Sequence, residues 1–199
     1  MSEPGKTSDR LEAKCLARRE ARLAMGGLSP VQAAEGSQAV CRLILESAVW
    51  QEAGQAMLFM PLPDELDISP LLANGLESAK RIALPRFSAK KNAYEACAIA
   101  SLGHLVPGKF GIHEPSPESH KMDTMQLDLA IVCGVAFDGL GGRLGRGGGF
   151  FDRLLADIPA KKCGVCFNQQ VHPDVPVERH DVKMDIIATP SGWLIPPPA

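Results

Sequence analysis

The feature that most constrains the fold is an apolar segment that leads into a glycine-rich loop and then a helix. Residues 127–138 (LDLAIVCGVAFD) are the most apolar part of the chain, which is typical of a buried central strand. The following residues, GLGGRLGRGGGFFDRLL (139–155), carry glycines and two arginines into a helix predicted over 149–157. Strand, glycine-rich loop and helix in this order present free backbone N–H groups to an anion.

The rest of the chain alternates strands with helices, which predicts a parallel sheet covered by helices. We expect helices over about 8–25, 30–51 and 69–79, and strands over 56–60, 81–85, 94–101, 161–167 and 185–189. The stretch 104–125 is rich in Pro, Gly, Ser and His and is predicted to be a long, functional loop. No linker divides the chain, so one domain over 1–199 with a loose tail at 1–7 is expected.

Composition excludes several classes of protein. The net charge is −2, from 21 basic and 23 acidic residues, which argues against a nucleic-acid or membrane partner. No apolar run approaches the roughly 18 residues that a membrane span needs, and the N-terminus lacks the apolar core of a signal peptide, so we expect a cytoplasmic protein.

Cys163 and Cys166 form a CxxC within a predicted strand. Residues three apart on a strand point to opposite faces, so we expect buried, reduced thiols rather than a disulfide or a zinc site.

Arg143 and Arg146 make a phosphate site a better interpretation of the loop than a flexible turn, because two cations alternate with backbone donors. A helix end alone stabilises an anion by about 0.3–1 kcal/mol, so the arginines and a metal ion must supply most of the affinity for a triphosphate. The loop matches neither GxxxxGK[ST] nor GxGxxG, which excludes a standard P-loop or dinucleotide site. Asp152, in the first turn of the helix, either complements the helix dipole or binds Mg²⁺.

Other charged residues have a plainer interpretation and a functional one. Lys14, Arg18 and Arg22 lie along one stripe of the first helix. The favoured interpretation is a solvent-exposed helix face, and the alternative is a second group of cations that contacts the same phosphates. Asp185 precedes a predicted strand and is either a second metal ligand or a turn residue. His180 and Asp181 suggest a dyad, but no Ser or Cys nucleophile is indicated, so we expect them to be loop residues.

Residues 134–155, GVAFDGLGGRLGRGGGFFDRLL, closely resemble the most specific signature of the 5-formyltetrahydrofolate cyclo-ligases, also called 5,10-methenyltetrahydrofolate synthetases. Weaker matches follow the family's order over nearly the whole chain: AKCLARREARLAM (13–25), LFMPLPDELD (58–67), IALPRF (82–87), GIHEP (111–115) and HDVKMDIIATP (180–190). The resemblance implies an α/β fold, a three-layer Rossmann-like sandwich with a mostly parallel central sheet flanked by helices (NagB/RpiA/CoA transferase-like).

The resemblance also implies an ATP- and Mg²⁺-dependent ligase. In such enzymes ATP phosphorylates the formyl oxygen of 5-formyltetrahydrofolate, and the neighbouring folate nitrogen then closes the ring as phosphate leaves. The products are 5,10-methenyltetrahydrofolate, ADP and phosphate. Ring closure is intramolecular, so proximity supplies much of its rate, and the protein's task is to position two ligands and neutralise phosphate charge.

Residue by residue, the resemblance implies these roles. ATP contacts fall on Lys14, Cys15, Leu16, Ala17, Arg18, Arg143, Leu144, Gly145, Arg146, Gly147, Gly148, Gly149, Phe150 and Phe151. Folate contacts fall on Met60, Glu65, Arg146, Gly147, Gly148, Gly149 and Phe150, with Glu65 as a partner for the N–H groups of the pterin. Mg²⁺ falls on Asp152 and Asp185, and the catalytic cations are Arg18, Arg143 and Arg146.

The chain departs from the family at several positions. Phe150 and Phe151 stand where two tyrosines are common, which preserves stacking but removes the hydroxyls, and Gly148 replaces a lysine that some members carry. Phe110 is the local aromatic candidate for stacking on folate near GIHEP. Two alternatives stay open: a non-catalytic folate- or nucleotide-binding homologue, and a relative of sugar-phosphate isomerases or CoA transferases. We expect 5-formyltetrahydrofolate, with or without a polyglutamate tail, and ATP as partners of a monomer or weak homodimer.

Overall fold

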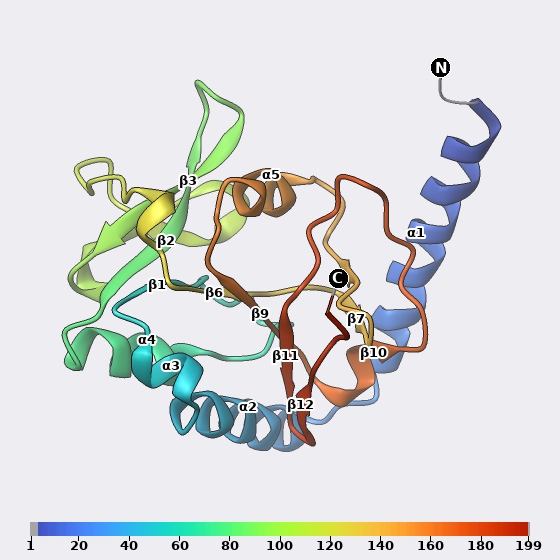
Figure 1. The fold of residues 1–199 in the computed structure, drawn as a ribbon, viewed down its shortest axis with the longest axis horizontal. Helices are drawn as coiled ribbons and strands as arrows, with labels where there is room; N and C mark the ends of the chain where they lie inside the picture. Colours follow the sequence, from blue (N-terminus) through green and yellow to red (C-terminus); the bar gives the residue numbers. More distant parts are fainter. Residues whose placement is uncertain (1–3, 199) are drawn as a thin grey trace.

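A mixed β-sheet forms the middle layer of the molecule (Figure 1). The computed structural model describes residues 4–198, apart from the side chains of residues 4–8 and of Phe110. These residues form a seven-stranded sheet in the order β12-β11-β9-β6-β1-β2-β3. Its strands are β1 (Gln55–Met57), β2 (Arg81–Ser88), β3 (Ala93–Ile99), β6 (Leu129–Val132), β9 (Lys161–Val165), β11 (Ile186–Thr189) and β12 (Gly192–Leu194). The inner strands run parallel and the edge strands β3 and β12 are antiparallel to their neighbours, which confirms the mostly parallel sheet.

Helices cover both faces of this sheet. On one face lie α2 (Pro30–Leu45), α3 (Ala48–Glu52) and α4 (Ser69–Glu77), and on the other lies α5 (Phe150–Ala156), as Figure 1 shows. Alternate residues of a strand point to opposite faces. In β6, Leu129 and Ile131 therefore join the core with α2, α3 and α4, whereas Ala130 and Val132 join the core with α5. The result is the three-layer α/β arrangement that was expected.

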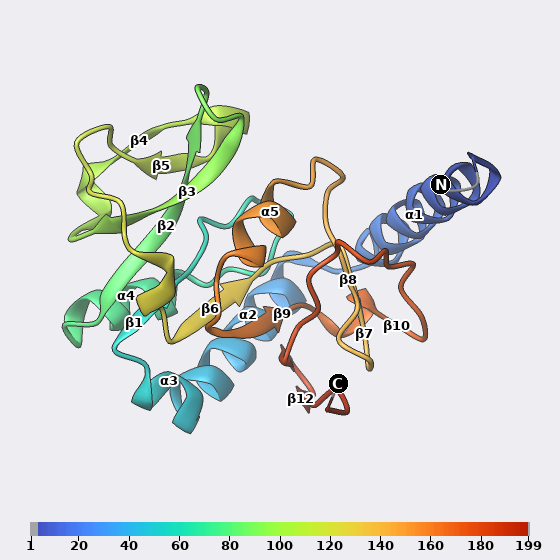
Figure 2. The same cartoon turned by 45° about the horizontal axis from the view of Figure 1, so that its top comes forward.

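The long first helix, α1 (Pro4–Met25), lies at the side of these layers (Figures 1 and 2). It packs on a small three-stranded sheet of β10 (Val171–His172), β7 (Ala136–Asp138) and β8 (Arg143–Leu144). Ala21 of α1 shares a buried cluster with Ala136 and Leu144. Because β8 begins the arginine-containing half of the glycine-rich loop, this packing brings α1 to the loop.

Two helix predictions need correction. The first helix begins at Pro4, so the tail expected at 1–7 is helical over residues 4–7, and residues 1–3 lie outside the described part. The helix predicted over 30–51 is two helices, because Glu46 ends α2 and the Ser47 side chain accepts a hydrogen bond from the backbone N–H of Trp50 to cap α3.

The strand prediction over 127–138 and the loop prediction over 104–125 also need correction. The segment 127–138 is two strands, since the chain leaves β6 after Val132 and β7 joins the small sheet; the Gln170 side chain bonds the carbonyls of Gly134 and Val135 at this bend. The predicted loop 104–125 contains the antiparallel pair β4 (Leu105–Pro107) and β5 (His113–Pro115). The C-terminal edge strand β12 was not predicted.

The two cysteines of the CxxC are buried, as predicted. Both are free and buried, and Cys163 lies in the core beneath one face of the sheet while Cys166 lies in the other core. Burial raises the pKa of both thiols, that of Cys166 to about 12, so neither is an available thiolate at neutral pH. None of the described helices has the length and apolar character needed to cross a bilayer.

Candidate active site

A cavity of about 450 Å³ lies where the carboxyl ends of β1, β2 and β6 meet the glycine-rich loop and α5. Open parallel sheets commonly bind ligands at this edge. Its walls are formed by Phe59, Met60, Leu62, Glu65, Pro85, Tyr94, Ile112, His113, Glu114, Cys133, Gly134, Arg143, Gly145, Arg146, Gly148, Gly149, Phe150, Phe151 and Asp152. A second hollow of about 640 Å³, at residues 98–106 and 116–120, contains none of the predicted site residues.

The glycine-rich loop requires glycine at specific positions. Gly147 and Gly149 have φ values of 110° and 64°, which side-chain-bearing residues rarely adopt. A Cβ on Gly148 would lie 2.7 Å from the ring of Phe150, so the aromatic ring occupies the space that a side chain would need. Since α5 has only seven residues, its dipole adds little, and any anion affinity must come chiefly from the loop N–H groups and the arginines.

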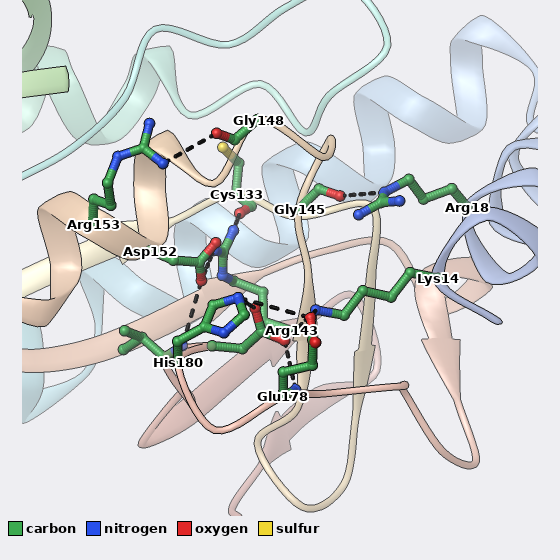
Figure 3. Close-up of polar contacts among 12 residues, drawn as sticks. Lys14, Arg18, Cys133, Arg143, Gly145, Gly148, Asp152, Arg153, Glu178 and His180 are labelled. Carbon is green, nitrogen blue, oxygen red and sulfur yellow. Dashed lines mark hydrogen bonds and ion pairs between the residues drawn. The ribbon is translucent and has the colours of Figure 1, made fainter. Parts of the chain in front are cut away.

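Arg143 is a buried anchor of the loop. Its side chain is 2% exposed; Nη2 donates to Oδ1 of Asp152 at 2.6 Å and Nη1 donates to the carbonyl of Cys133 at 3.1 Å (Figure 3). Nε is buried with no hydrogen-bond partner among the described residues. Oδ1 of Asp152 also accepts a longer bond, 3.4 Å, from the backbone N–H of Val182. Arg143 therefore fixes Asp152 at the cavity wall through one carboxylate oxygen.

Arg146 lies at the cavity wall with 44% of its side chain exposed. Its Nε donates to Oε1 of Glu65 at 3.0 Å and its Nη2 donates to Oδ1 of Asp64 at 2.7 Å. The hydrogen bond from Arg146 lowers the pKa of Asp64. The other oxygen of Glu65, Oε2, accepts the backbone N–H of Leu62 at 3.0 Å. Arg146 thus joins the glycine-rich loop to the loop after β1, and both oxygens of Glu65 are already engaged.

The basic stripe of α1 is not a solvated face, contrary to the interpretation that the sequence favoured. Lys14 is 7% exposed, and its Nζ donates to Oε2 of Glu178 and Oδ2 of Asp181, each at 2.6 Å. Arg18 Nε donates to the carbonyl of Gly145 at 2.8 Å, as Figure 3 shows. Arg18 therefore reaches the glycine-rich loop, Lys14 reaches the segment before β11, and Arg22 stays exposed.

Protonation in the Lys14 cluster favours the charged forms. Burial lowers the pKa of Lys14, but its hydrogen bonds with Asp181 and Glu178 outweigh burial and raise the pKa. For Asp181, burial raises the pKa, but the hydrogen bond from Lys14 outweighs burial and the pKa is lowered overall. The hydrogen bond from Lys14 also lowers the pKa of Glu178. Glu178, His180 and Asp181 each offer a ligand atom within 4.8 Å of the others, but one oxygen of each carboxylate is already paired with the ammonium group of Lys14.

The remaining predicted residues divide into those at the cavity and those away from it. Met60, Phe150 and Phe151 line it, whereas Cys15 and Leu16 are exposed on α1 and Ala17 packs against the small sheet. Asp185 is exposed and accepts the backbone N–H of Lys162 at 2.6 Å, at the amino ends of β9 and β11. The structure therefore does not bring Asp185 to the cavity wall that holds Asp152. The side chain of Phe110 lies outside the described part.

Sequence reasoning missed two groups of residues. Glu178 and Asp181 hold Lys14; Asp181 had been expected to be a loop residue, and no local sequence signal linked either residue to Lys14. Tyr94 and Glu114 line the cavity from β3 and β5. The Tyr94 ring centroid lies 5.7 Å from that of Phe150 in an edge-to-face arrangement, and the only signal for it was that the chain has a single tyrosine.

Comparisons with known proteins show the family and the fold that this chain resembles. Residues 10–190 match the model of the 5-formyltetrahydrofolate cyclo-ligase family. The 5-formyltetrahydrofolate cyclo-ligase of Escherichia coli (strain K12) is 32% identical over 174 residues, which are 82% of this chain and 93% of that protein. The mitochondrial 5-formyltetrahydrofolate cyclo-ligase of Arabidopsis thaliana is 26% identical and covers 96% of this chain and 80% of its own length. The NMR structure of Aquifex aeolicus 5,10-methenyltetrahydrofolate synthetase superposes with a TM-score of 0.83 at 28% identity, over 94% of each chain.

Proposed function

The chain belongs to the 5-formyltetrahydrofolate cyclo-ligase family, an ATP-dependent ligase family, and from that premise we propose that it converts 5-formyltetrahydrofolate to 5,10-methenyltetrahydrofolate with ATP and Mg²⁺. One observation carries the proposal beyond membership. A single cavity joins an arginine-bearing glycine loop, suited to phosphate, to an aromatic wall, suited to a pterin ring.

The loop end of the cavity is suited to the phosphates. Arg146 is partly exposed, and its pair with the exposed Asp64 is worth only about 0–1 kcal/mol, so a phosphate can displace Asp64 at little cost. Arg146 is therefore the cation that we assign to contact ATP. Arg143 and Arg18 act as positioning residues, because the first holds Asp152 and the second holds the carbonyl of Gly145.

Asp152 is suited to Mg²⁺, which is commonly held by one or two carboxylates together with waters and substrate phosphates. Its Oδ1 is fixed by Arg143, and its Oδ2 has no hydrogen bond from any described residue. When bound, the metal would supply charge neutralisation at the transferring phosphoryl group. The contacts of Asp185 give no support to its predicted role as second ligand.

The aromatic wall supports folate binding without the two usual tyrosines. Phe87, Tyr94, Phe150 and Phe151 form edge-to-face contacts with centroid separations of 5.5–6.0 Å. Phe150 and Phe151 keep the stacking surface, and Tyr94 returns one hydroxyl to it. Burial raises the pKa of Tyr94 to about 12, so that hydroxyl remains a hydrogen-bond donor at neutral pH.

The chemistry needs positioning rather than a protein nucleophile. Phosphoryl transfer to the formyl oxygen makes that oxygen a good leaving group; attack by the neighbouring folate nitrogen then forms the C–N bond as the C–O bond to phosphate breaks. The residues hold the formyl oxygen near the γ-phosphate, neutralise its charge and keep bulk water out of an aromatic-walled site. The predicted monomer or weak homodimer, the polyglutamate tail and the cytoplasmic location stay predictions, the last because one relative is mitochondrial.

The direct test mixes purified protein with 5-formyltetrahydrofolate, Mg²⁺ and ATP and follows methenyltetrahydrofolate by its absorbance. We expect product that depends on ATP, with one ADP released per ring closed. Ligand binding without turnover would support a non-catalytic homologue instead. Isomerisation of a sugar phosphate without any requirement for ATP would support the isomerase alternative.

A further inference from the structure

We propose that the buried carboxylate of Asp138 is a positioning residue for ATP, a role that rests on the proposed function. Asp138 ends β7 and is 2% exposed. It is not among the described residues that line the cavity, so it acts on a bound nucleotide only through other residues. Its hydrogen bonds join two parts of the chain that carry polar groups of the phosphate end: the turn that leads into the glycine-rich loop, and the segment 175–184.

The first attachment is to the turn between β7 and β8. Oδ1 of Asp138 accepts the backbone N–H groups of Leu140 and Gly142, each at 2.8 Å. The backbone N–H of Asp138 also donates to the carbonyl of Gly142 at 3.1 Å. A Cβ on Gly142 would clash with the carboxylate, so glycine leaves the space that Asp138 fills. Because Arg143 is the next residue, the turn determines where this anchor of the loop begins.

The second attachment is to the segment 175–184. Oδ2 of Asp138 accepts the backbone N–H of Val175 at 2.9 Å, in a buried bond at the start of this segment. At the other end, the backbone N–H of Met184 donates to the carbonyl of Gly141 at 2.8 Å. Both ends of the segment are therefore tied to the same turn between β7 and β8, and Asp138 provides the side chain that joins them.

Between its two ends, the segment contacts groups of the proposed phosphate and metal site. The backbone N–H of Val182 donates to Oδ1 of Asp152 at 3.4 Å. Glu178 and Asp181 each pair with Nζ of Lys14 at 2.6 Å, on the side of the loop that α1 approaches (Figure 3). A shift of the segment relative to the turn would therefore displace these groups from their places beside the glycine-rich loop.

The arrangement requires a carboxylate at Asp138. A carboxylate accepts hydrogen bonds at both oxygens, whereas an asparagine side chain has one acceptor and one donor group. The amide group of asparagine would face either the N–H of Val175 or those of Leu140 and Gly142. A donor placed against a donor leaves a buried N–H unpaired, which is costly, so the turn or the segment must move.

The test measures two affinities separately by calorimetry, well below the melting temperature: that for ATP with Mg²⁺, and that for 5-formyltetrahydrofolate alone. Asp138→Asn should weaken ATP binding about tenfold or more, since misplacing groups by about 1 Å at a site can cost about 100-fold. It should change folate binding by less than about threefold, because Phe87 and Tyr94 of the aromatic wall lie on β2 and β3, apart from the turn.

Two controls separate positioning from stability. Asp174→Asn makes the same change at an exposed neighbour of Val175 and should behave as wild type. Ile44→Ala removes buried atoms from α2, on the face of the sheet opposite α5, and should lower Tm by several degrees with both affinities unchanged. If Asp138 were merely structural, Asp138→Asn would behave as Ile44→Ala does, with fewer folded molecules and wild-type affinities.

Gly142→Ala is a second route to the same result, because it keeps the carboxylate of Asp138 but forces it aside. It should also weaken ATP binding more than folate binding, and it decides the question if Asp138→Asn does not fold. Wild-type ATP affinity in the folded variants, or an equal loss in Ile44→Ala, would overturn the role of Asp138. Calorimetry needs no turnover, so a wild-type protein that binds ATP without forming product would contradict the proposed function while the affinities still decided this role.

Discussion

Replacing Asp152 by asparagine separates its structural role from its proposed metal role. The Arg143 guanidinium that it neutralises is 2% exposed, and removing one partner of a buried ion pair costs about 3–5 kcal/mol. Asparagine keeps an oxygen that can accept the 2.6 Å hydrogen bond, so we take the lower end, about 3 kcal/mol. In a domain of this size each kcal/mol shifts Tm by about 2–4 °C, so we expect Asp152→Asn to melt about 6–12 °C below wild type.

Thermal unfolding followed by circular dichroism measures this shift. Asp157→Asn, at the exposed C-terminal end of α5, is the matched control and should stay within about 2 °C of wild type. The double variant Arg143→Met/Asp152→Asn should lose less free energy of unfolding than the two single variants lose together, because it no longer buries the unpaired guanidinium of Arg143. An Asp152→Asn variant that melts with wild type would refute the ion pair as an anchor of the loop. Separately, an unchanged Mg²⁺ titration of activity in that variant would refute Asp152 as a metal ligand.

Two further predictions concern charged residues around the loop. Arg146→Ala should lower kcat/KM for ATP at least tenfold while changing the free energy of unfolding by no more than about 1–2 kcal/mol, because the pair with Asp64 is largely exposed and only Glu65, whose side chain is 11% exposed, loses a shielded partner. Arg81→Ala, at the exposed start of β2, is the control, and a fully active Arg146→Ala would remove that residue from the site. The second prediction is a pH window for the Lys14 cluster. The pKa of Lys14 is raised and those of its two carboxylate partners are lowered. The stabilisation should therefore be full between about pH 5 and 10, and should fade as pH rises through the folded pKa of Lys14 or falls through those of the carboxylates. Lys14→Met should flatten both limbs in urea unfolding across pH, and limbs as steep as those of wild type would contradict the assignment.

Local sequence signals were sufficient for the layers of the fold and for the loop. Alternating strand and helix patterns predicted the parallel sheet, and the run of glycines predicted the loop before α5. Boundaries failed where tertiary contacts decide: Ser47 splits one expected helix through its cap, and Gln170 holds the bend that divides 127–138. Neither contact has a periodic signature.

The site was less predictable because its partners are distant in the chain. Lys14 meets Glu178 across 164 residues, so the stripe on α1 looked solvated when taken alone. Asp185 precedes a parallel strand and so lies at the amino edge of the sheet; its contacts there give no support to a metal role, which stays a prediction.

The most direct test of the account follows one oxygen atom. The protein is supplied with 5-formyltetrahydrofolate carrying ¹⁸O in the formyl group, together with ATP and Mg²⁺, and the released phosphate is examined by mass spectrometry. If ATP phosphorylates the formyl oxygen in this cavity, each phosphate should carry one ¹⁸O as methenyltetrahydrofolate appears. Unlabelled phosphate, or ring closure without ATP, would contradict it.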